Sequence, residues 1–535
     1  MALRDGNTIT FTEVDELNNP ALTLVYSELQ SDPSLKNGLG NVIKGRIDIA
    51  HAPGASTPWS VKSLQNLLID VFLPAGYPHS VSEDYIPYQI FDSLQAFSSS
   101  IAGLLSSRAV LQGVGVGNAD ASPTSALLLH ILQDTSGRIA TILFVHRVGT
   151  ALEPECKMYR FAADIFNDLA MVLDCLSPMI PAGVSRVTIL SAAGVLRALC
   201  GVAGGSSKAS LSAHFAKWGN LAEVNAKDSS QETVISLVGM LVGSLVVSHI
   251  TSFTATWLTL LALLTLHLSL NYAAVRSVQM TTLNRQRANI VFSSALSSDT
   301  DFALLASDQL LDQHHPQIET GSENQKHLQI PSPADVSKTE RIFDASGALK
   351  WYPHLSRKEG PGTPQILGHC EIGVSLRQFM SSSSSSISTS SGSLKTTLPL
   401  GPLTSLFAGE DYILTFTHMT LSPKTKPTAK ILLKQHATPK THLKAWMHAL
   451  VAARIITQSP SPFSSPSSSS RQDEKKDDSA TETMLSILSR TLSFLNEFSR
   501  FERYIGALGD AGWEVDVEGS VSALETRIGR RVVVL

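Results

Sequence analysis

Four charged residues recur along one short segment at spacings that could build a binding site for an ion or a small polar molecule. In "KMYRFAADIFNDLA" the residues Lys157, Arg160, Asp164 and Asp168 follow one another at intervals of three or four. Side chains at these intervals lie on one face of a helix. They either form salt bridges on a solvated face, or line the interior of a helical bundle that binds an anion, a cation or a small polar ligand.

The surroundings of this segment bear on the choice. Apolar segments flank it on both sides, and few other charged residues are available to pair with its side chains. We therefore expect Arg160, Asp164 and Asp168 to face the interior of a bundle. A buried charge without a partner would be costly there.

A second polar cluster follows in "SLSAHFAKWGNLAEVNAKD", which contains His214, Lys217, Asn220, Lys227 and Asp228. A histidine beside lysines in a loop is usually solvated, and the alternative is a second ligand-binding group. We treat these five residues, with the four above, as candidate ligand-binding residues. The sequence predicts no catalytic residue and no metal ligand.

A long run without charge predicts elements that would hold these groups. After Glu232 the next charged residue is Arg276, so the 43 positions 233–275 hold no Asp, Glu, Lys or Arg. A single helix of that length would measure about 65 Å, roughly twice a hydrocarbon core. Two transmembrane spans, 234–250 and 257–272, joined by a turn at 251–256, fit better. The alternative is a buried helical hairpin in a large soluble core.

The residues that flank the run predict its orientation and its start. Basic residues lie on both sides: Lys217, Lys227, Arg276, Arg285 and Arg287. The positive-inside rule assigns that side to the cytosol or an equivalent compartment. Ser229 and Glu232 have the spacing of a capping box, so we expect a helix to begin there, just before the apolar run.

Other apolar segments are interrupted by Arg108 or Arg197, and they are candidates for further spans or for helices packed against the bundle. Small-residue pairs at four-residue spacing would let helices approach closely: Gly113/Gly117, Gly201/Gly205 and Gly239/Gly243.

Composition limits the class of protein. Charged residues make up 16% of the 535 residues and the formal net charge is −4, so nucleic-acid binding has no electrostatic support. Four scattered cysteines without a CxxC pair indicate neither a disulfide framework nor a zinc site. The N-terminus lacks the apolar core of a signal peptide and is too acidic for a transit peptide, so we expect no cleaved leader.

The order of segments predicts a mainly α protein, with a helical membrane-associated bundle and a smaller α+β C-terminal domain. We expect a lead segment at 1–55, the bundle at 56–290, a polar linker at 291–340 and the C-terminal domain at 341–535. "NTITFTEV" in the lead segment could form a strand. Two Ser-rich tracts, 381–393 and 459–480, should be disordered loops of the C-terminal domain because they cannot bury enough surface to fold.

Several stretches resemble the root UVB sensitive family, whose domain is also described as the vitamin B6 photo-protection and homoeostasis domain. The resemblance covers about 60–290, through "FLPAGYPHSVSEDYIPYQIFDSLQAFSSSIAGLLSSRAVLQGVGVG", "KMYRFAADIFNDLA", "HFAKWGNLAEVNAKDSSQET" and "NYAAVRSVQMTTLNRQR". The region from "HCEIGVSL" to "GWEVDVEG" resembles the family's C-terminal domain. The resemblance implies a membrane-associated protein connected with UV-B responses and pyridoxal-phosphate homeostasis, and it supplies no catalytic residues.

We therefore favour a non-enzymatic integral membrane protein that handles a small polar ligand or scaffolds partners. Its expected partners are membrane lipids and a related family member or another protein. One alternative is a pyridoxal-phosphate-binding enzyme, a cofactor that only the resemblance implies. It would need a Schiff-base lysine beside an acid, such as Lys157 with Asp164 or Lys227 with Asp228, and a phosphate-binding loop that neither pair has. The other alternative is a pure protein-interaction module.

Overall fold

A computed structural model describes much of the chain. The described residues are 8–14, 20–29, 44–50, 69, 71–113, 123–181, 183–306, 328–344, 346–353, 363–380, 398–417, 426–458, 473–515, 524 and 531–534. The chain divides into two compact units, Met1–Ile86 with Ser212–Leu237, and Pro87–Leu211 with Val238–Leu535. Each unit is described by itself.

The first unit contains a three-stranded antiparallel sheet in the order β1 (Thr8–Val14), β2 (Pro20–Leu29), β3 (Lys44–Ala50). The strand expected at "NTITFTEV" is β1. In the same unit, the segment before α2 is fixed to residues 215–217: Ser82 N–H donates to the Phe215 carbonyl at 3.0 Å, and Lys217 N–H donates to the Ser80 carbonyl at 3.1 Å.

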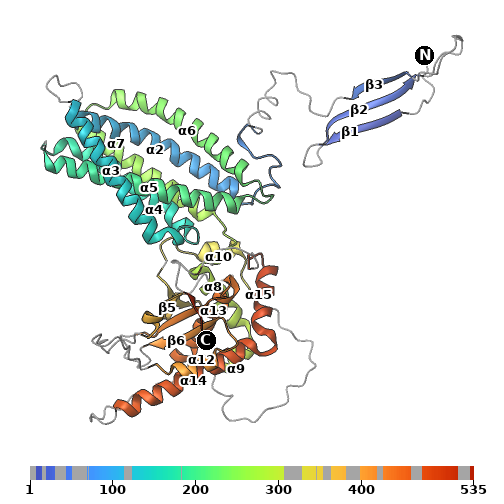
Figure 1. The fold of residues 1–535 in the computed structure, drawn as a ribbon. Helices are drawn as coiled ribbons and strands as arrows, with labels where there is room; N and C mark the ends of the chain where they lie inside the picture. The colour runs from blue at the N-terminus through green and yellow to red at the C-terminus, as the bar shows by residue number, and fades with distance from the viewer. Residues whose placement is uncertain are drawn as a thin grey trace. The chain divides into compact units, whose positions relative to one another are not determined.

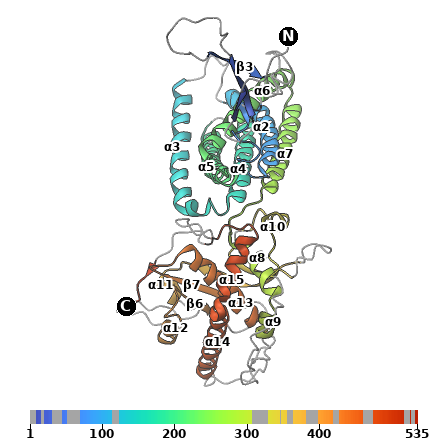
Figure 2. The same cartoon turned by 90° about the vertical axis from the view of Figure 1, so that its right-hand side faces the viewer.

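Long helices make up the first half of the second unit, and parts of three of them belong to the first unit. Figures 1 and 2 show these helices running alongside one another. They are α2 (Tyr85–Gly113), α3 (Pro123–Val148), α4 (Cys156–Leu176), α5 (Val184–Phe215), α6 (Leu221–His249) and α7 (Phe253–Ser277). Three of them, α5, α6 and α7, are long and apolar enough to cross a membrane. Short 3-10 turns, Gly149–Ala151 and Ser177–Met179, flank α4.

The charge-free run forms the expected hairpin of two helices, with a shorter turn than predicted. Helix α6 ends at His249 and α7 begins at Phe253, where the Ser252 side chain caps its first turn by accepting from Ala255 N–H at 3.2 Å. Arg108 of α2 supplies hydrogen-bond donors to backbone carbonyls at this tight turn. Its guanidinium donates to the carbonyls of Val247 and Ile250 at 2.9 and 2.7 Å, which are otherwise unpaired at a helix C-terminus.

The capping-box prediction at Ser229 is wrong. Helix α6 starts two turns earlier, at Leu221, so Ser229 lies inside it. The Ser229 hydroxyl donates to the Asn225 carbonyl at 2.9 Å, one turn back along the helix. The polar residues before the apolar run therefore continue the helix instead of starting it.

The three glycine pairs differ in outcome. Gly239 and Gly243 pack against α2 so closely that added Cβ atoms would lie 2.8 Å from the Ser100 Cβ and 2.7 Å from the Leu104 Cδ1, as the sequence predicts. Gly201 and Gly205 face open space, so the prediction is wrong for that pair within this chain. Gly113 approaches the Ser177 hydroxyl, and Gly117 lies outside the described residues.

The C-terminal half of the second unit is α+β, as expected. Its five-stranded sheet has the order β4 (Ala348–Trp351), β5 (Gln365–Ile372), β7 (Thr428–Lys434), β6 (Tyr412–Thr417), and β8 (Arg531–Val532) pairs with β7. The β5–β7 and β7–β8 pairs are parallel and the others antiparallel. The helices are α8 (Arg285–Ser298), α9 (Thr300–Ala306), α10 (Pro333–Thr339), α11 (Leu376–Met380), α12 (Leu400–Leu406), α13 (Pro439–Gln458), α14 (Asp473–Asn496) and α15 (Arg500–Asp510).

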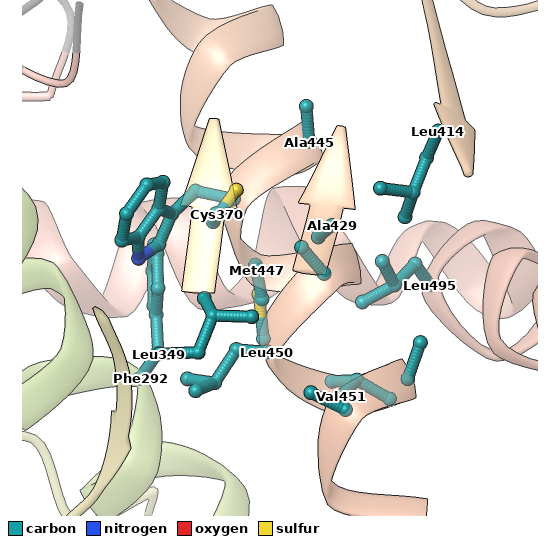
Figure 3. Packing of buried hydrophobic residues seen from close by; sticks show 14 of the residues in the cluster. Phe292, Leu349, Cys370, Leu414, Ala429, Ala445, Met447, Leu450, Val451 and Leu495 are labelled. Carbon is teal, nitrogen blue, oxygen red and sulfur yellow. The ribbon is translucent and has the colours of Figure 1, made fainter. Parts of the chain in front are cut away.

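The core of this half lies where α13 packs on the sheet. Figure 3 shows Met447, Leu450 and Val451 of α13 among Leu349 and Cys370 of neighbouring strands. Every residue of β6 is buried, including the polar Thr415 and Thr417. The mainly α fold class with a smaller α+β domain is thus confirmed.

The expected linker at 291–340 is helical at both ends. It contains the second half of α8, then α9 and α10. Asn284 caps the start of α8, and Ser332 caps the start of α10. The apolar faces of the three helices pack on the C-terminal core. Residues 307–327 and the tract 381–393 lie outside the described residues. In the second Ser-rich tract, 459–472 also lies outside them, whereas 473–480 forms the start of α14 rather than a disordered loop.

Candidate functional site

The polar face of α4 points into the bundle. Arg160, Asp164 and Asp168 are 8%, 7% and 4% exposed, whereas Leu169 on another face of the helix is 48% exposed. An amphipathic helix in water has the opposite arrangement. The three charged residues therefore face the interior, as the sequence predicts, and their role as ligand-binding residues stays a prediction.

Arg160 is the centre of a buried hydrogen-bond network. Its guanidinium lies 2.7 Å from Asp92 Oδ1 on α2 and 3.1 Å from Asp164 Oδ1 one turn along α4. Its Nε donates to the Tyr88 hydroxyl at 3.3 Å. The i,i+4 salt bridge of the alternative interpretation is therefore made, but inside the bundle instead of on a solvated face.

Helix α7 contributes a histidine and an asparagine to the same network. His267 Nδ1 lies 2.8 Å from Asp168 Oδ1, and His267 Nε2 lies 3.7 Å from Asp164 Oδ2. Asn271, one turn further on, donates its amide to Asp164 Oδ2. Among the described residues, the buried acceptor oxygens Asp168 Oδ2 and Asn271 Oδ1 have no hydrogen-bond partner, and neither has Oε1 of Gln95, whose amide donates to Asp92.

A regular register between α2 and α4 positions the network. Three polar pairs join them, each 68 residues apart: Asp92 with Arg160, Ser99 with Asn167, and Ser106 with Asp174. The equal offset means that the two helices run parallel, and each step is seven residues, or two turns. Arg197 of α5 pairs with Asp174 and thus extends the polar seam.

Lys157 is on the same helix but belongs to a different cluster. Its ammonium lies 2.7 Å from Glu340 Oε2, just after α10, and Arg287 of α8 lies 3.7 Å from the other oxygen. Arg276 at the end of α7 donates to the Glu340 and Lys338 carbonyls. Burial raises the pKa of Glu340, but Arg287 and Lys157 outweigh it and hold that pKa below its usual value. This cluster joins α4 and α7 to α10.

Glu155 lies beside this cluster without a basic partner in hydrogen-bonding contact. Asn284 donates to its Oε2 at 3.0 Å, while its Oε1 finds no partner among the residues that the structure describes. Burial, with the nearby Glu340 carboxylate, raises the pKa of Glu155 to about 7 against the opposing effect of Arg287. Glu155 is therefore a titratable group at the start of α4.

The remaining candidates lie in the first unit and do not form one cluster. The His214 side chain is 5% exposed, and its Nε2 lies 2.9 Å from Asp84 Oδ2. Asp84 accepts from the Ser82 hydroxyl at 2.5 Å. Lys217 is exposed, and Lys227 donates to the Val71 carbonyl at 3.2 Å. Asn220 precedes α6 with its buried amide atoms unpaired, and Asp228 is buried within α6. His214 thus helps to hold the segment before α2, and a role of these five residues in ligand binding stays a prediction.

The residues do not fit pyridoxal phosphate as a Schiff-base cofactor. The Lys157 ammonium is committed to Glu340, and Asp164 is committed to Arg160 and Asn271, so the two do not form the required pair. Lys227 and Asp228 are sequence neighbours on α6, but Lys227 extends to the Val71 carbonyl near the surface while Asp228 is buried. In the described part of the chain, no three His, Cys, Asp or Glu side chains are placed to hold a metal ion.

Sequence reasoning missed Asp92, His267 and Asn271. Each carries a signal in retrospect. Asp92, Ser99 and Ser106 repeat every seven residues, in step with Arg160, Asn167 and Asp174. His267 and Asn271 are polar side chains one turn apart inside an otherwise apolar helix, a position that favours a partner in the interior.

Comparison with known proteins gives separate matches for the helical bundle and for the C-terminal domain. A model of the vitamin B6 photo-protection and homoeostasis domain matches residues 58–299, and a model of the root UVB sensitive protein C-terminal domain matches residues 410–518. The first match contains the whole network around Arg160. No solved structure matches the chain.

Curated relatives match over part of their length. "RUS family member 1" of Dictyostelium discoideum is 42% identical over 283 residues, which are 52% of this chain and 48% of the relative. "Protein root UVB sensitive 3" of Arabidopsis thaliana is 37% identical over 226 residues, 42% of this chain and 51% of the relative. "Protein root UVB sensitive 5" of the same plant is 27% identical over 277 residues, 50% of this chain and 54% of the relative. The chain thus spans about half the length of these relatives.

Proposed function

The chain belongs to the root UVB sensitive family and carries its vitamin B6 photo-protection and homoeostasis domain, and from this premise we propose that it is an integral membrane protein that handles a small polar ligand inside its helical bundle. Its role would be in vitamin B6 homeostasis or in protection against UV-B and other stress. Scaffolding of partner proteins is a further proposal, which the sequence alone motivates.

One observation carries the proposal: the bundle is polar inside and apolar outside. Ionisable side chains inside a membrane are costly, and they normally mark a path or a site for a substrate or ion. Asp92, Arg160, Asp164, Asp168 and His267 form such a group, and each is less than 9% exposed.

The outer surface supports insertion into lipid. In α6 only 11% of the most apolar 18-residue window is buried, and Leu241 and Leu245 are 62% and 64% exposed. A water-soluble protein rarely exposes apolar surface so continuously. At 1.5 Å per residue, the 25 residues of α7 would reach about 38 Å, enough to cross a hydrocarbon core of about 30 Å.

The chemistry of the network suits a ligand with groups of both signs. A guanidinium binds phosphate or carboxylate in a fixed fork geometry, and carboxylates bind protonated ring nitrogens or amines. B6 vitamers combine a ring nitrogen with hydroxyl or phosphate groups, so they could exchange with the contacts that Arg160 and Asp164 now make to each other.

Membrane insertion is tested by alkaline carbonate extraction of native membranes. We expect the protein to stay in the pellet together with a known integral protein. Release into the supernatant would show that the apolar helices do not cross the bilayer, and the membrane part of the proposal would fail.

Ligand handling is tested by thermal unfolding of the purified full-length protein in detergent, with pyridoxine, pyridoxal and pyridoxal phosphate in turn. We expect at least one vitamer to raise the midpoint of the parent protein and of Asp134→Asn, an exposed surface control, but not of Asp164→Asn. Equal shifts in all three proteins, or no shift in any, would argue against a vitamer site at this network. A vitamer that stays covalently attached to a lysine after borohydride reduction and denaturation would instead favour the cofactor-binding alternative.

A further inference from the structure

Inside the bundle, acidic groups outnumber basic ones. Asp92, Asp164 and Asp168 share one guanidinium, that of Arg160, and one imidazole, that of His267. Three carboxylates and one guanidinium leave a charge of −2 if His267 is neutral, and −1 if it is protonated. Asp174 does not change this balance because Arg197 pairs with it.

Basic groups on the neighbouring helices do not neutralise the excess negative charge. Arg108 of α2 is committed to the carbonyls of Val247 and Ile250 and to the Thr256 hydroxyl at the hairpin turn. On α5, Arg197 faces Asp174, and the Cys200 thiol lies within electrostatic range of Asp164 and Asp168. Among the described residues, no other Lys or Arg lies within ion-pair distance of Asp92, Asp164 or Asp168.

Buried excess charge is expensive, and a protein usually relieves it by taking up a proton. Of the unpaired buried oxygens among the described residues, two lie beside His267 on α4 and α7 and identify where a proton would be held. Asp168 Oδ2 and Asn271 Oδ1 are buried acceptors without a donor, while Asp168 Oδ1 faces His267. A proton on Asp168 Oδ2 would turn one orphan acceptor into a donor and cancel one negative charge.

We propose that Asp168 and His267 together hold an exchangeable proton, so that the bundle takes up and releases protons as it handles its ligand. The proposal rests on the proposed function, since it concerns the same buried network. In uptake, hydronium transfers a proton to Asp168 Oδ2, which forms an O–H bond and leaves water. Release reverses the step, and no electrons are transferred.

The polar face of α4 offers a route for that proton. From Lys157 to Asp174 the face covers 18 residues. The 17 steps between them span about 26 Å along the helix, close to the thickness of a hydrocarbon core. Hydrogen-bonding side chains of α2, α5 and α7 accompany it. At the Asp174 end the polar seam reaches Arg197 of α5. The Arg197 side chain is 46% exposed, so this end of the seam lies at the surface of the bundle.

The test is infrared difference spectroscopy of the purified full-length protein between acidic and alkaline pH, in a Glu155→Gln background, because Glu155 is another buried carboxyl that protonates near neutral pH. This Glu155→Gln protein is the parent of the comparison. A protonated buried carboxyl absorbs separately from a carboxylate. We expect the parent protein to show that band near neutral pH and to lose it at alkaline pH. Asp168→Asn should lack it, whereas Asp134→Asn, which removes an exposed carboxylate of α3, should keep it. A parent spectrum without the band, or a band that survives in Asp168→Asn, would overturn the proposal.

A second variant covers the case in which Asp168→Asn fails to fold. His267→Gln keeps a donor toward Asp168 but removes the positive charge that the imidazole can carry. We expect the carboxyl band to persist to higher pH than in the parent protein, and an unchanged titration would contradict the shared proton. Vitamer binding at constant pH is a separate measurement, so loss of the vitamer effect with the band intact would refute only the ligand proposal.

Discussion

Arg160 and Arg138 make the same i,i+4 contact in opposite surroundings. In Arg160–Asp164 the side chains are 10% and 9% exposed, whereas in Arg138–Asp134 they are 77% and 55% exposed. Arg160→Met should cost about 3 to 5 kcal/mol because it leaves buried carboxylates without their partner. Arg138→Met should cost only about 0 to 1 kcal/mol. Thermal unfolding in detergent measures both, and equal losses would contradict the difference in surroundings.

Glu155 should make stability depend on pH. In the folded protein the pKa of its carboxyl is about 7, against 4.5 for an unperturbed one, because burial disfavours the ionised form. Unfolded chains therefore release this proton first as the pH rises, and the folded state loses up to about 3 kcal/mol between pH 4.5 and pH 7. Below that window the group contributes no penalty.

The variant Glu155→Gln isolates this effect. It cannot ionise, so its stability should fall less than that of the parent protein between about pH 5 and about pH 8. Unfolding midpoints at the two pH values give the comparison. Parallel pH profiles for the two proteins would show that Glu155 is ionised throughout.

At the residue scale, the sequence predicts one half of each contact. The spacing of Arg160, Asp164 and Asp168 is local, so their common face could be predicted. Their partners Asp92 and His267 lie 68 and 99 residues away from them, and no spacing rule within one helix pairs residues over that distance. Lys157 shows that a shared helix face does not predict the partner. It lies on the same face as Arg160 but pairs with Glu340, in the segment predicted to be a linker.

Among the elements, α6 gives a matched test of close helix packing. A Cβ at Gly239 would meet the Ser100 Cβ at 2.8 Å and the Phe97 carbonyl at 3.0 Å, whereas a Cβ at Gly201 of α5 would meet nothing within 4 Å. Gly201→Ala should therefore stabilise its helix by up to about 1 kcal/mol. Gly239→Ala should instead lower the unfolding midpoint, because α2 and α6 must separate. A rise in both variants would contradict the close contact.

The hairpin of α6 and α7 shows which parts of an element are predictable. The absence of charge over 233–275 predicts two long helices because it extends over many residues. The ends of the two helices are harder to predict. The Ser229–Glu232 pattern predicts that a helix starts there, but α6 already begins at Leu221. The tight turn depends on Arg108, which comes from another helix and satisfies carbonyls that a local reading leaves unpaired.

For the molecule as a whole, the arrangement of basic residues predicts which way the hairpin faces. The turn between α6 and α7 should lie on the opposite side of the membrane from Arg276, Arg285 and Arg287, which should be cytosolic. A cysteine introduced at Thr251 should react with a membrane-impermeant maleimide applied from the non-cytosolic side, and one introduced at Gln279 should not. The opposite pattern would invert the topology, and labelling of both would argue against a sealed hairpin.

The register of α2 with α4 also has a consequence for how the chain folds as it is made. When α4 leaves the ribosome, α2 already exists 68 residues upstream, so Arg160 can find Asp92 at once. Asp168 must wait for His267, which is synthesised 99 residues later. Until α7 arrives, the polar face of α4 has its partners on α2 and α5 but not those on α7. Synthesis halted between α4 and α7 should therefore yield a chain that depends on chaperones or the insertion machinery to shield that face.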